Sequence, residues 1–266
     1  MNVESEELIR LERDGSIATI WLDRPSKRNA MSHAMWARLE DLALRLGADR
    51  DVRVVVLRGS GKHFCAGADI TQLNLVHGAD ERSFSHVVDA AETALAGLPK
   101  PTVAFISGDC IGGGASLAID CDFRIATPDA RFGITPAKLG IIYPAAALER
   151  ATHLLGPAVT KRLLFTGELI GAIDAQDVGL VDEIVDAANG EDHLATLTAV
   201  LAARSLLTQA ATKSMVAEIA AHGRVPKDVQ QRWTAVAAGA PDLAEGVAAF
   251  VGKRPPRFTW SGPDGN

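Results

Sequence analysis

The stretch VRVVVLRGSGKHFCAGADI, residues 52–70, joins a run of mostly apolar residues to a glycine-rich loop. The run from Val52 to Arg58 has the length of a strand, and its near-continuous apolar character is typical of a strand buried on both faces of a parallel sheet. Glycine in the loop from Gly59 to Ile70 lets backbone N–H groups approach a ligand, because glycine has no Cβ. The stretch therefore predicts an α/β protein with a ligand site at the carboxyl end of a strand.

A second stretch has the same organisation. The apolar run from Pro101 to Ser107 leads into a loop from Ser107 to Ser116 that contains three consecutive glycines, followed by a helix over residues 113–120. Two such loops after neighbouring strands favour a binding site over two ordinary tight connections. Neither loop is a phosphate-binding P-loop, because the upstream Gly and the Ser or Thr after Lys62 are absent, and no dinucleotide-binding G-x-G-x-x-G opens the first crossover helix.

The other elements follow an α/β order and then become helical. Asp14-Gly15 is typical of a hairpin turn, Ser32 can cap a helix with a regular apolar face, and a second such face begins at Phe84. Alternating strands and helices favour a largely parallel sheet. We expect an α/β core over residues 1–190 and a dependent helical region over 191–266. The expected strands cover residues 8–13, 16–22, 122–127 and 180–185, and the expected late helices cover 194–203, 209–221, 226–238 and 243–251.

Composition excludes several classes of protein. The 266 residues carry a net charge of −6, so a broad basic surface for nucleic acid is not expected. Three cysteines without a C-x-x-C argue against a disulfide scaffold or a zinc ribbon, and the histidines show no metal-ligand spacing. Apolar runs are too short for a signal peptide or a membrane helix. These features predict a cytoplasmic protein without metal that binds neither membrane nor nucleic acid. The chain has 24 glycines and a single tyrosine.

Ten short segments, in order along nearly the whole chain, resemble the crotonase superfamily, also called the enoyl-CoA hydratase/isomerase family. The matching segments are Leu22–Pro25, Arg28–Ala30, Phe64–Ile70, Gly112–Gly114, Cys121–Ala126, Ala130–Gly133, Leu139–Gly140, Phe165–Gly167, Gly179–Val181 and Phe250–Arg254. The resemblance implies a ClpP/crotonase-like spiral of β-β-α units with a helical C-terminal region used for trimerisation and as a lid on CoA. It also implies a homotrimer or a dimer of trimers.

The resemblance further implies that the protein binds an acyl-CoA thioester and belongs to fatty acid metabolism. Backbone N–H groups at Ala68 and Gly113 would stabilise the enolate oxygen, as fixed donors do when charge develops on an oxygen. Coenzyme A would be part of the substrate, so no separate cofactor is expected. Residues expected at the CoA moiety are Arg24, Lys27, Arg28, Ala30, Ala66, Asp69, Ile70 and Lys253.

The chain departs from the family where hydratases keep their acids. The two glutamate positions hold Ser116 and Pro136, and the aspartate position of isomerases and relatives holds Pro144. Tyr143 and the tail from Lys253 to Phe258 resemble the methylmalonyl-CoA decarboxylase branch, although that branch keeps a glutamate at the position of Ser116. Departure of CO₂ produces the enolate without a base, so decarboxylase-like chemistry with Tyr143 and Ser116 near the reacting carbons is the specific hypothesis.

Three alternatives remain open. Hydration or double-bond isomerisation could use another acid, with Asp120, Asp69 and Glu149 as candidates. Gly114-Ala115-Ser116-Leu117-Ala118 partly resembles a serine hydrolase elbow, with Asp182 and His222 following in hydrolase order. The chain could also bind acyl-CoA without catalysis.

Overall fold

A computed structural model describes residues 8–72 and 83–262 of the chain. Its main sheet has six strands in the order β1-β2-β3-β4-β6-β9. β1 and β2 form the predicted hairpin and are antiparallel, whereas the other neighbouring strands are parallel. The sequence expectations for residues 1–7 and 263–266 lie outside the described residues. The strands are Ile9–Asp14 (β1), Ile17–Leu22 (β2), Val54–Gly59 (β3), Thr102–Ile106 (β4), Phe123–Ala126 (β6) and Glu183–Ile184 (β9).

A second, three-stranded sheet was not predicted. It contains Asp109–Ile111 (β5), Arg131–Gly133 (β7) and Ile170–Gly171 (β8), in the order β5-β7-β8. The chain reaches it through Gly108, whose φ of 54° turns the backbone away from the main sheet. A Cβ on Gly108 would lie 2.7 Å from His63 Nδ1, so a larger residue does not fit. The second glycine-rich stretch is therefore not a plain loop, because β5 lies inside it.

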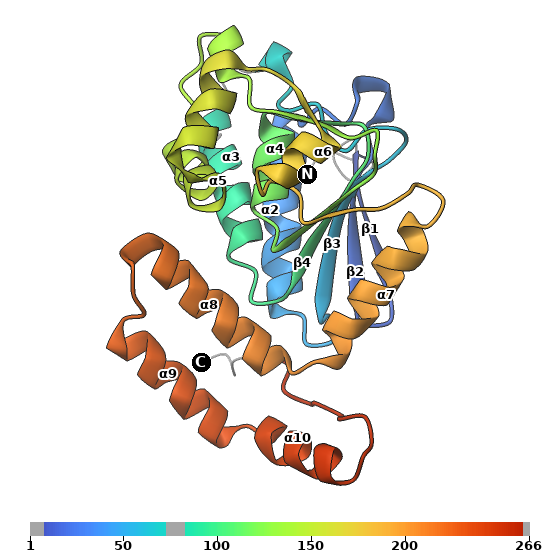
Figure 1. Cartoon of the computed structure of the whole chain (residues 1–266), viewed down its shortest axis with the longest axis vertical. Coiled ribbons are helices and arrows are strands. Elements are labelled where there is room, and N and C mark those ends of the chain that lie inside the picture. Colours follow the sequence, from blue (N-terminus) through green and yellow to red (C-terminus); the bar gives the residue numbers. More distant parts are fainter. Residues whose placement is uncertain (1–7, 73–82, 263–266) are drawn as a thin grey trace.

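Four helices are associated with the apolar core on one side of the main sheet (Figure 1). They are His33–Ala48 (α2), Phe84–Ala96 (α3), Gly113–Ile119 (α4) and Ala145–Thr166 (α5). The Ser32 side chain accepts a hydrogen bond from the Met35 N–H at 3.3 Å, which confirms the predicted cap. All the apolar residues predicted for the inner face of α2 are buried. The helix α5 is interrupted at Gly156, which has φ 73° and precedes Pro157.

The opposite face of the sheet is covered by Gly190–Ala203 (α7). Leu194 on this helix joins a second apolar cluster with side chains of β3, β4 and β6. Ala172–Asp177 (α6) precedes α7, and Leu206–His222 (α8), Lys227–Gly239 (α9) and Asp242–Val251 (α10) follow it. The four late helices confirm the predicted spans to within about a turn, whereas the predicted strand at 180–185 contains only the two residues of β9.

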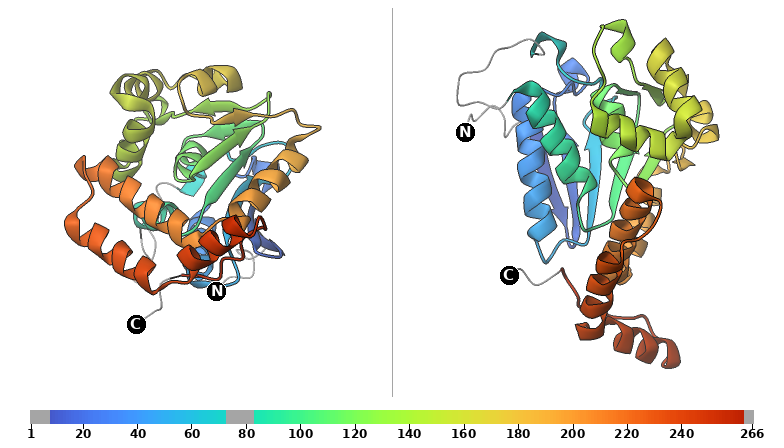
Figure 2. Two further views of the ribbon diagram at one scale, coloured as in Figure 1. Left: turned by 60° about the horizontal axis from the view of Figure 1, so that its bottom comes forward. Right: turned by 90° about the vertical axis from the view of Figure 1, so that its left-hand side faces the viewer.

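The last helices extend away from the α/β core. Figure 1 and the right view of Figure 2 both show α9 and α10 at the end of the molecule opposite the short helix η2, Ile70–Gln72. In the part of the chain that the structure describes, no single helix is long and apolar enough to cross a membrane. The bent pairs α7–α8 and α9–α10 meet that test only when each pair is taken together.

Candidate active site

The first glycine-rich loop is held in place by a buried asparagine. Asn29 Nδ2 donates hydrogen bonds to the carbonyl oxygens of Ser60 and His63, at 2.9 and 2.6 Å. Asn29 Oδ1 accepts from the backbone N–H of Arg24 at 2.9 Å. A Cβ on Gly59 would lie 2.7 Å from Asn29 Nδ2, so glycine at the end of β3 leaves room for this side chain. The segment from Arg28 to Ala30 thus fixes the conformation of the loop that follows β3.

The two glycine-rich stretches pack directly against each other. Cys65 in the first forms a parallel β-bridge with Cys110 in the second, and the Ile111 N–H donates to the Cys65 carbonyl at 2.9 Å. Gly114, in the first turn of α4, faces the same residue, because a Cβ there would lie 2.8 Å from Cys65 Cβ. The start of α4 therefore packs directly against the first loop, and this contact leaves no room for a side chain at position 114.

This packing brings together the backbone N–H groups of Ala68 and Gly113. A Cβ built on Gly113 would lie 3.5 Å from the Ala68 nitrogen, and a Cβ built on Gly67 would lie 3.6 Å from the Gly113 nitrogen. Within residues 8–72 and 83–262, neither N–H donates a hydrogen bond to another residue. Gly113 is also the first residue of α4, where N–H groups have no partner inside the helix. Two adjacent donors of this kind can polarise one carbonyl oxygen.

The structure also brings Ser116 and Tyr143 together. Ser116 is buried on α4, and Tyr143 lies two residues before α5. Their side-chain oxygens are 2.5 Å apart. Burial raises the pKa of Tyr143, so the phenol keeps its proton at neutral pH. The two prolines at the other acid positions have backbone roles, since Pro136 opens the short helix η3 (Pro136–Lys138) and Pro144 is the N-cap of α5.

Behind Ser116 lies a buried ionic cluster that sequence reasoning did not assemble. Arg150 on α5 donates from Nη2 to Glu92 Oε2 at 2.8 Å, and its Nε forms an ion pair with Asp120 Oδ1. Burial raises the pKa of Glu92 to about 7, although the charge of Arg150 opposes this. The pKa of Asp120 is raised by burial and then by the neighbouring Glu92 charge. Burial therefore shifts both carboxyl groups toward their protonated forms, and the Arg150 charge opposes the shift.

Glu92 and Arg150 were both missed, although Glu92 left a signal in the sequence. It lies four residues after Val88 and three before Leu95, on the apolar face of α3. An acid on such a face must find a buried partner, because burying an isolated charge is costly. Nothing in the sequence indicated which residue the partner is. Asp120, the candidate acid one turn after Ser116, belongs to this cluster.

The other two candidate acids have different surroundings. Hydrogen bonds from Thr71, and then from Arg24, hold the pKa of Asp69 below its usual range. The Arg24 ion pair with Asp69 has a length of 2.7 Å. Glu149 is exposed on α5. Asp69 therefore serves as an ionised partner of Arg24 in the described contacts, and Glu149 faces solvent.

The hydrolase arrangement is not assembled. The hydroxyl of Ser116 contacts Tyr143, whereas Asp182 pairs with Arg124 at 2.8 Å and His222 lies on α8 at 3.7 Å from Glu218. A serine nucleophile needs a histidine within hydrogen-bond reach. Among the described residues, Ser116 has no histidine hydrogen-bond partner, and the chain order of the three residues was a coincidence of sequence.

The cations Arg24, Lys27 and Arg28 have different environments. Arg24 is half-buried and donates to the Ala30 carbonyl at 3.1 Å as well as to Asp69. Arg28 is largely exposed and pairs with Asp109 at 3.1 Å, while its carbonyl accepts from the Ala66 N–H at 2.9 Å. Lys27 is exposed on the short helix η1 (Pro25–Lys27), and Ile70 is 62% exposed at the start of η2. Arg24 therefore stabilises the loop, and Lys27 and Arg28 are more open to a ligand.

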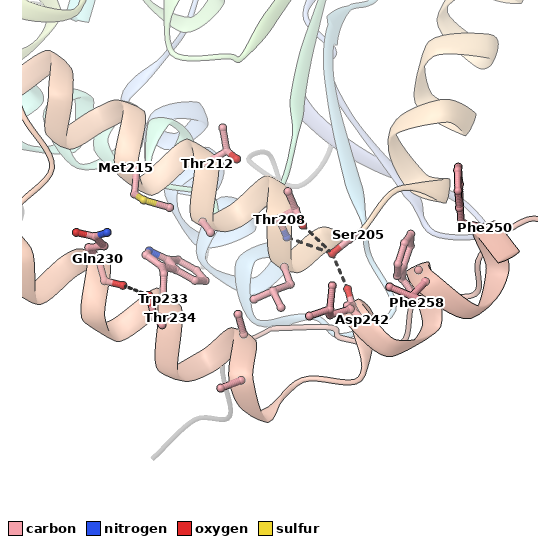
Figure 3. A pocket seen from close by; sticks show the side chains of 17 residues that line it. Ser205, Thr208, Thr212, Met215, Gln230, Trp233, Thr234, Asp242, Phe250 and Phe258 are labelled. Carbon is pink, nitrogen blue, oxygen red and sulfur yellow. Dashed lines mark hydrogen bonds between the residues drawn. The ribbon is translucent and has the colours of Figure 1, made fainter.

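Lys253 follows α10, in the region that projects away from η2 (Figure 1). The fold of one chain thus separates it from the loop that carries Ala66 and Ile70. Near it, a cavity of about 910 Å³ lies between α8, α9 and α10. Figure 3 shows Met215, Trp233 and Phe258 among its lining side chains. This cavity belongs to the helical region and does not include the two glycine-rich loops. No group of three or more His, Cys, Asp or Glu side chains in residues 8–72 and 83–262 could hold a metal ion.

Comparison with known proteins agrees with this architecture. The sequence pattern of the family described as enoyl-CoA hydratase/isomerase matches residues 12–261. The chain is 34% identical over 249 residues to the bovine (Bos taurus) mitochondrial enoyl-CoA hydratase domain-containing protein 2, covering 91% of this chain and 84% of that protein. It is 30% identical to the rat (Rattus norvegicus) mitochondrial methylglutaconyl-CoA hydratase, with 96% and 84% covered.

Solved structures share the whole fold. The crystal structure of an enoyl-CoA hydratase/carnithine racemase from Magnetospirillum magneticum matches with a TM-score of 0.89 and 31% identity, over 96% of each chain. The α/β class and the crotonase-like fold expected from the sequence are confirmed. The chain therefore belongs to the enoyl-CoA hydratase/isomerase family, the crotonase superfamily, whose enzymes act on acyl-CoA thioesters.

Proposed function

We propose that this enzyme binds an acyl-CoA with its thioester oxygen between the N–H groups of Ala68 and Gly113 and stabilises the thioester enolate. The observation that carries the proposal is the adjacency of these two donors, neither of which has a hydrogen-bond acceptor among the described residues. An enolate oxygen carries more negative charge than the thioester oxygen, so fixed donors stabilise the transition state more than the substrate. Gly113 lies at the N-terminus of α4, where the positive end of the helix dipole further stabilises the enolate oxygen.

The proposed reaction is loss of CO₂ from a malonyl-type acyl-CoA. No acid stands at positions 116, 136 or 144, but this reaction needs no base, because departing CO₂ leaves its electron pair in the enolate. The Ser116 and Tyr143 hydroxyls would orient the carboxylate of the substrate. Tyr143 would then deliver its proton to the α-carbon, a role supported by the raised pKa that keeps the phenol protonated.

A second candidate is hydration of an enoyl-CoA, favoured by the names of the relatives, which are hydratases. Hydration requires a base that activates water and an acid that protonates the α-carbon. The acids whose charges act on Tyr143 are Glu92 and Asp120, and Arg150 pairs with both. Both carboxyl side chains are almost fully buried, at 1% and 0% exposure, and are paired with Arg150, whereas decarboxylation requires no base.

The test is product analysis by mass spectrometry after incubation with methylmalonyl-CoA, malonyl-CoA and crotonyl-CoA. We expect release of CO₂ from a malonyl-type thioester, and loss of that release in Gly113→Pro, which removes one N–H donor. Tyr143→Phe should lower the rate by about 10²-fold, a common contribution of one general acid. Rapid hydration of crotonyl-CoA that is unchanged in Tyr143→Phe would replace the decarboxylase assignment. Tight CoA binding with no turnover of any thioester would identify a non-catalytic binder.

The CoA phosphates are proposed to contact Lys27 and Arg28, the two exposed cations at the C-terminal end of the short helix η1. Arg28 is positioned for this by Asp109, a fully buried carboxylate that also pairs with Arg131 at 2.5 Å. Within one chain, Lys253 lies at the end of the molecule opposite the loop of Ala66 and Ile70. We therefore propose that it reaches the CoA of a neighbouring copy. A single exposed cation contributes little to the free energy of binding. The Lys27–Arg28 pair and Lys253 would therefore bind the phosphates together.

The helical region is proposed to form the contact between copies in a homotrimer or a dimer of trimers. Large apolar side chains are exposed along α10, including Leu243 at 76% and Phe250 at 87% exposure. Monomeric proteins seldom leave a contiguous patch of this kind open to water. Sedimentation of the purified enzyme would measure the mass of the assembly, and Phe250→Glu should reduce it to the monomer.

A further inference from the structure

The buried cluster behind Ser116 contains more acid than base. Glu92 comes from α3, Asp120 is the C-cap of α4, and Arg150 comes from α5. Three helices therefore contribute one residue each to the cluster. The side chains of Glu92 and Asp120 are 1% and 0% exposed. Asp89, one turn before Glu92 on α3, adds a further negative charge nearby. One guanidinium cannot compensate all these carboxylates.

Hydrogen bonding shows the same imbalance. Glu92 Oε1 and Asp120 Oδ2 are buried without a hydrogen-bond partner in the part of the chain that the structure describes, and Asp120 Oδ1 has only its ion pair with Arg150. Lys213 lowers the pKa of Asp120 from a distance, but its ammonium pairs with Asp122 at 2.8 Å. Two buried carboxyl groups that share one arginine are stabilised when a proton stays on one of them. The direction of both pKa shifts agrees with this state.

The carboxyl pair is connected to the proposed catalytic hydroxyls. Ser116 and Asp120 lie one turn apart on α4, where the Asp120 N–H donates to the Ser116 carbonyl at 2.9 Å. The Ser116 hydroxyl is close enough to the Glu92 carboxyl group to lower its pKa, and Glu92 Oε1, which has no hydrogen-bond partner among the described residues, is available to bond it. On its other side the same hydroxyl is 2.5 Å from the Tyr143 oxygen. Ser116 can therefore accept a hydrogen bond from one neighbour and donate one to the other, as a hydroxyl allows.

We propose that Glu92 and Asp120 form a proton reservoir that restores the proton of Tyr143 through Ser116. This inference rests on the proposed function. When Tyr143 gives its phenolic proton to the α-carbon of the enolate, Ser116 gives its hydroxyl proton to the phenolate oxygen. Glu92 gives its carboxyl proton to Ser116 Oγ in the same step. The result is a neutral tyrosine, a neutral serine and a Glu92 carboxylate paired with Arg150. The carboxylate later takes a proton from solvent.

The relay removes the negative charge that proton transfer would leave on the buried Tyr143 oxygen. A tyrosine that has given up its proton would be a phenolate in surroundings that already disfavour the charged form. The relay moves that negative charge to a carboxylate that has an arginine partner. Glu92 and Asp120 do not touch the substrate in this scheme, so they are positioning and proton-supplying residues that act through Ser116.

The experiment compares wild-type enzyme with Glu92→Gln on the malonyl-type thioester that the wild type decarboxylates. We expect the kcat of the variant to fall by about 10²-fold, whereas KM changes little, because Glu92 does not contact the substrate. The kcat of the wild type should fall as the pH rises above about 7, where Glu92 loses its proton, and the variant should lack this fall. Among the described residues, the ionisable groups that interact electrostatically with Glu92 include Asp89 on its own helix, Asp120, Tyr143 and Arg150.

Two further variants separate a relay from a structural role. Glu92→Asp keeps a titrating carboxyl and should recover part of the rate together with the pH dependence. Asp89→Asn is the matched control on the same helix, and it should keep the rate while moving the fall in kcat to lower pH. Asp89 raises the pKa of Glu92, so its removal lowers that pKa. Circular dichroism of each variant establishes that it is folded.

The outcomes are distinct. A folded Glu92→Gln variant with wild-type kcat and wild-type pH dependence would overturn the relay and leave the decarboxylase function standing. A wild-type enzyme that turns over no malonyl-type thioester would overturn the proposed function and the relay with it. A loss of kcat in Glu92→Gln that Glu92→Asp does not relieve, with no change in pH dependence, would assign Glu92 a structural role and refute the relay.

Discussion

Replacing Glu92 by glutamine should change how the stability of the protein depends on pH. Glutamine keeps the size of the side chain and can still accept a hydrogen bond from Arg150, but it cannot take up a proton. The wild-type carboxyl has a raised pKa because it is buried on α3 with only one arginine to compensate it and Asp120. The perturbation therefore removes a titration from the folded state and leaves the fold otherwise close to the original.

The size and sign of the effect follow from the pKa. In the folded protein the pKa of Glu92 is raised from 4.5 to about 7. Between these two values the folded chain holds a proton that the unfolded chain has released, so the free energy of unfolding decreases as the pH rises through this window. At about 1.4 kcal/mol per tenfold change in proton affinity, the decrease amounts to roughly 3 kcal/mol. Above about pH 7 the loss from this group is complete.

Urea unfolding of both proteins, at about pH 5 and at about pH 8, measures this difference. The decrease in unfolding free energy between the two pH values should be smaller in Glu92→Gln by up to roughly 3 kcal/mol. Glu149→Gln is the control, because it makes the same chemical change at an exposed position on α5. Equal pH dependence in Glu92→Gln and wild type would refute the conclusion that burial raises this pKa.

Other substitutions test the packing of the loops and the charges around them. Gly114→Ala places a Cβ 2.8 Å from Cys65 Cβ, so we expect a loss of several kcal/mol in urea unfolding together with a loss of turnover, whereas Gly239→Ala on α9 meets nothing within 4 Å and should be neutral or slightly stabilising. Burial lowers the pKa of Lys100 from 10.5 to about 8, so wild-type stability should rise as the pH increases between these values, and Lys100→Met should abolish that rise in thermal melts. Lys27→Glu should weaken CoA binding several-fold at low salt in a calorimetric titration, with a smaller difference at high salt; an equal affinity at low salt would remove Lys27 from the proposed phosphate site.

The sequence identified the elements whose pattern is local. The Ser32 cap and the apolar face of α2 were predicted because a helix face depends on residues three and four positions apart. The second sheet was missed because β5 and β7 have three residues each and pair across 22 positions, without an apolar period long enough to detect. For the same reason the predicted strand at 180–185 was too long, since only two residues of β9 find a partner on β6.

In the candidate site, too, the sequence indicated the residues of local motifs but not the contacts between distant segments. The glycines and the Ala68–Gly113 pair could be proposed from motifs, and Tyr143 from its resemblance to a tyrosine of the decarboxylase branch. The partner of Glu92 and Asp120 could not be predicted from the sequence, because Arg150 comes from another helix. Asp120 appeared as a free candidate acid, yet Arg150 lies 30 positions later and Glu92 lies 28 positions earlier in the chain.

The sequence by itself determined the family, the α/β order and the positions where a hydratase would have its acids, because each of these depends on residue identity at fixed spacing. Tertiary structure decided which side chains meet. It placed the hydroxyls of Ser116 and Tyr143 in contact and gathered Glu92, Asp120 and Arg150 behind them from three helices. The physical reason is that a charge buried on one helix is tolerated only where another helix supplies its partner, and helix packing alone fixes that meeting point.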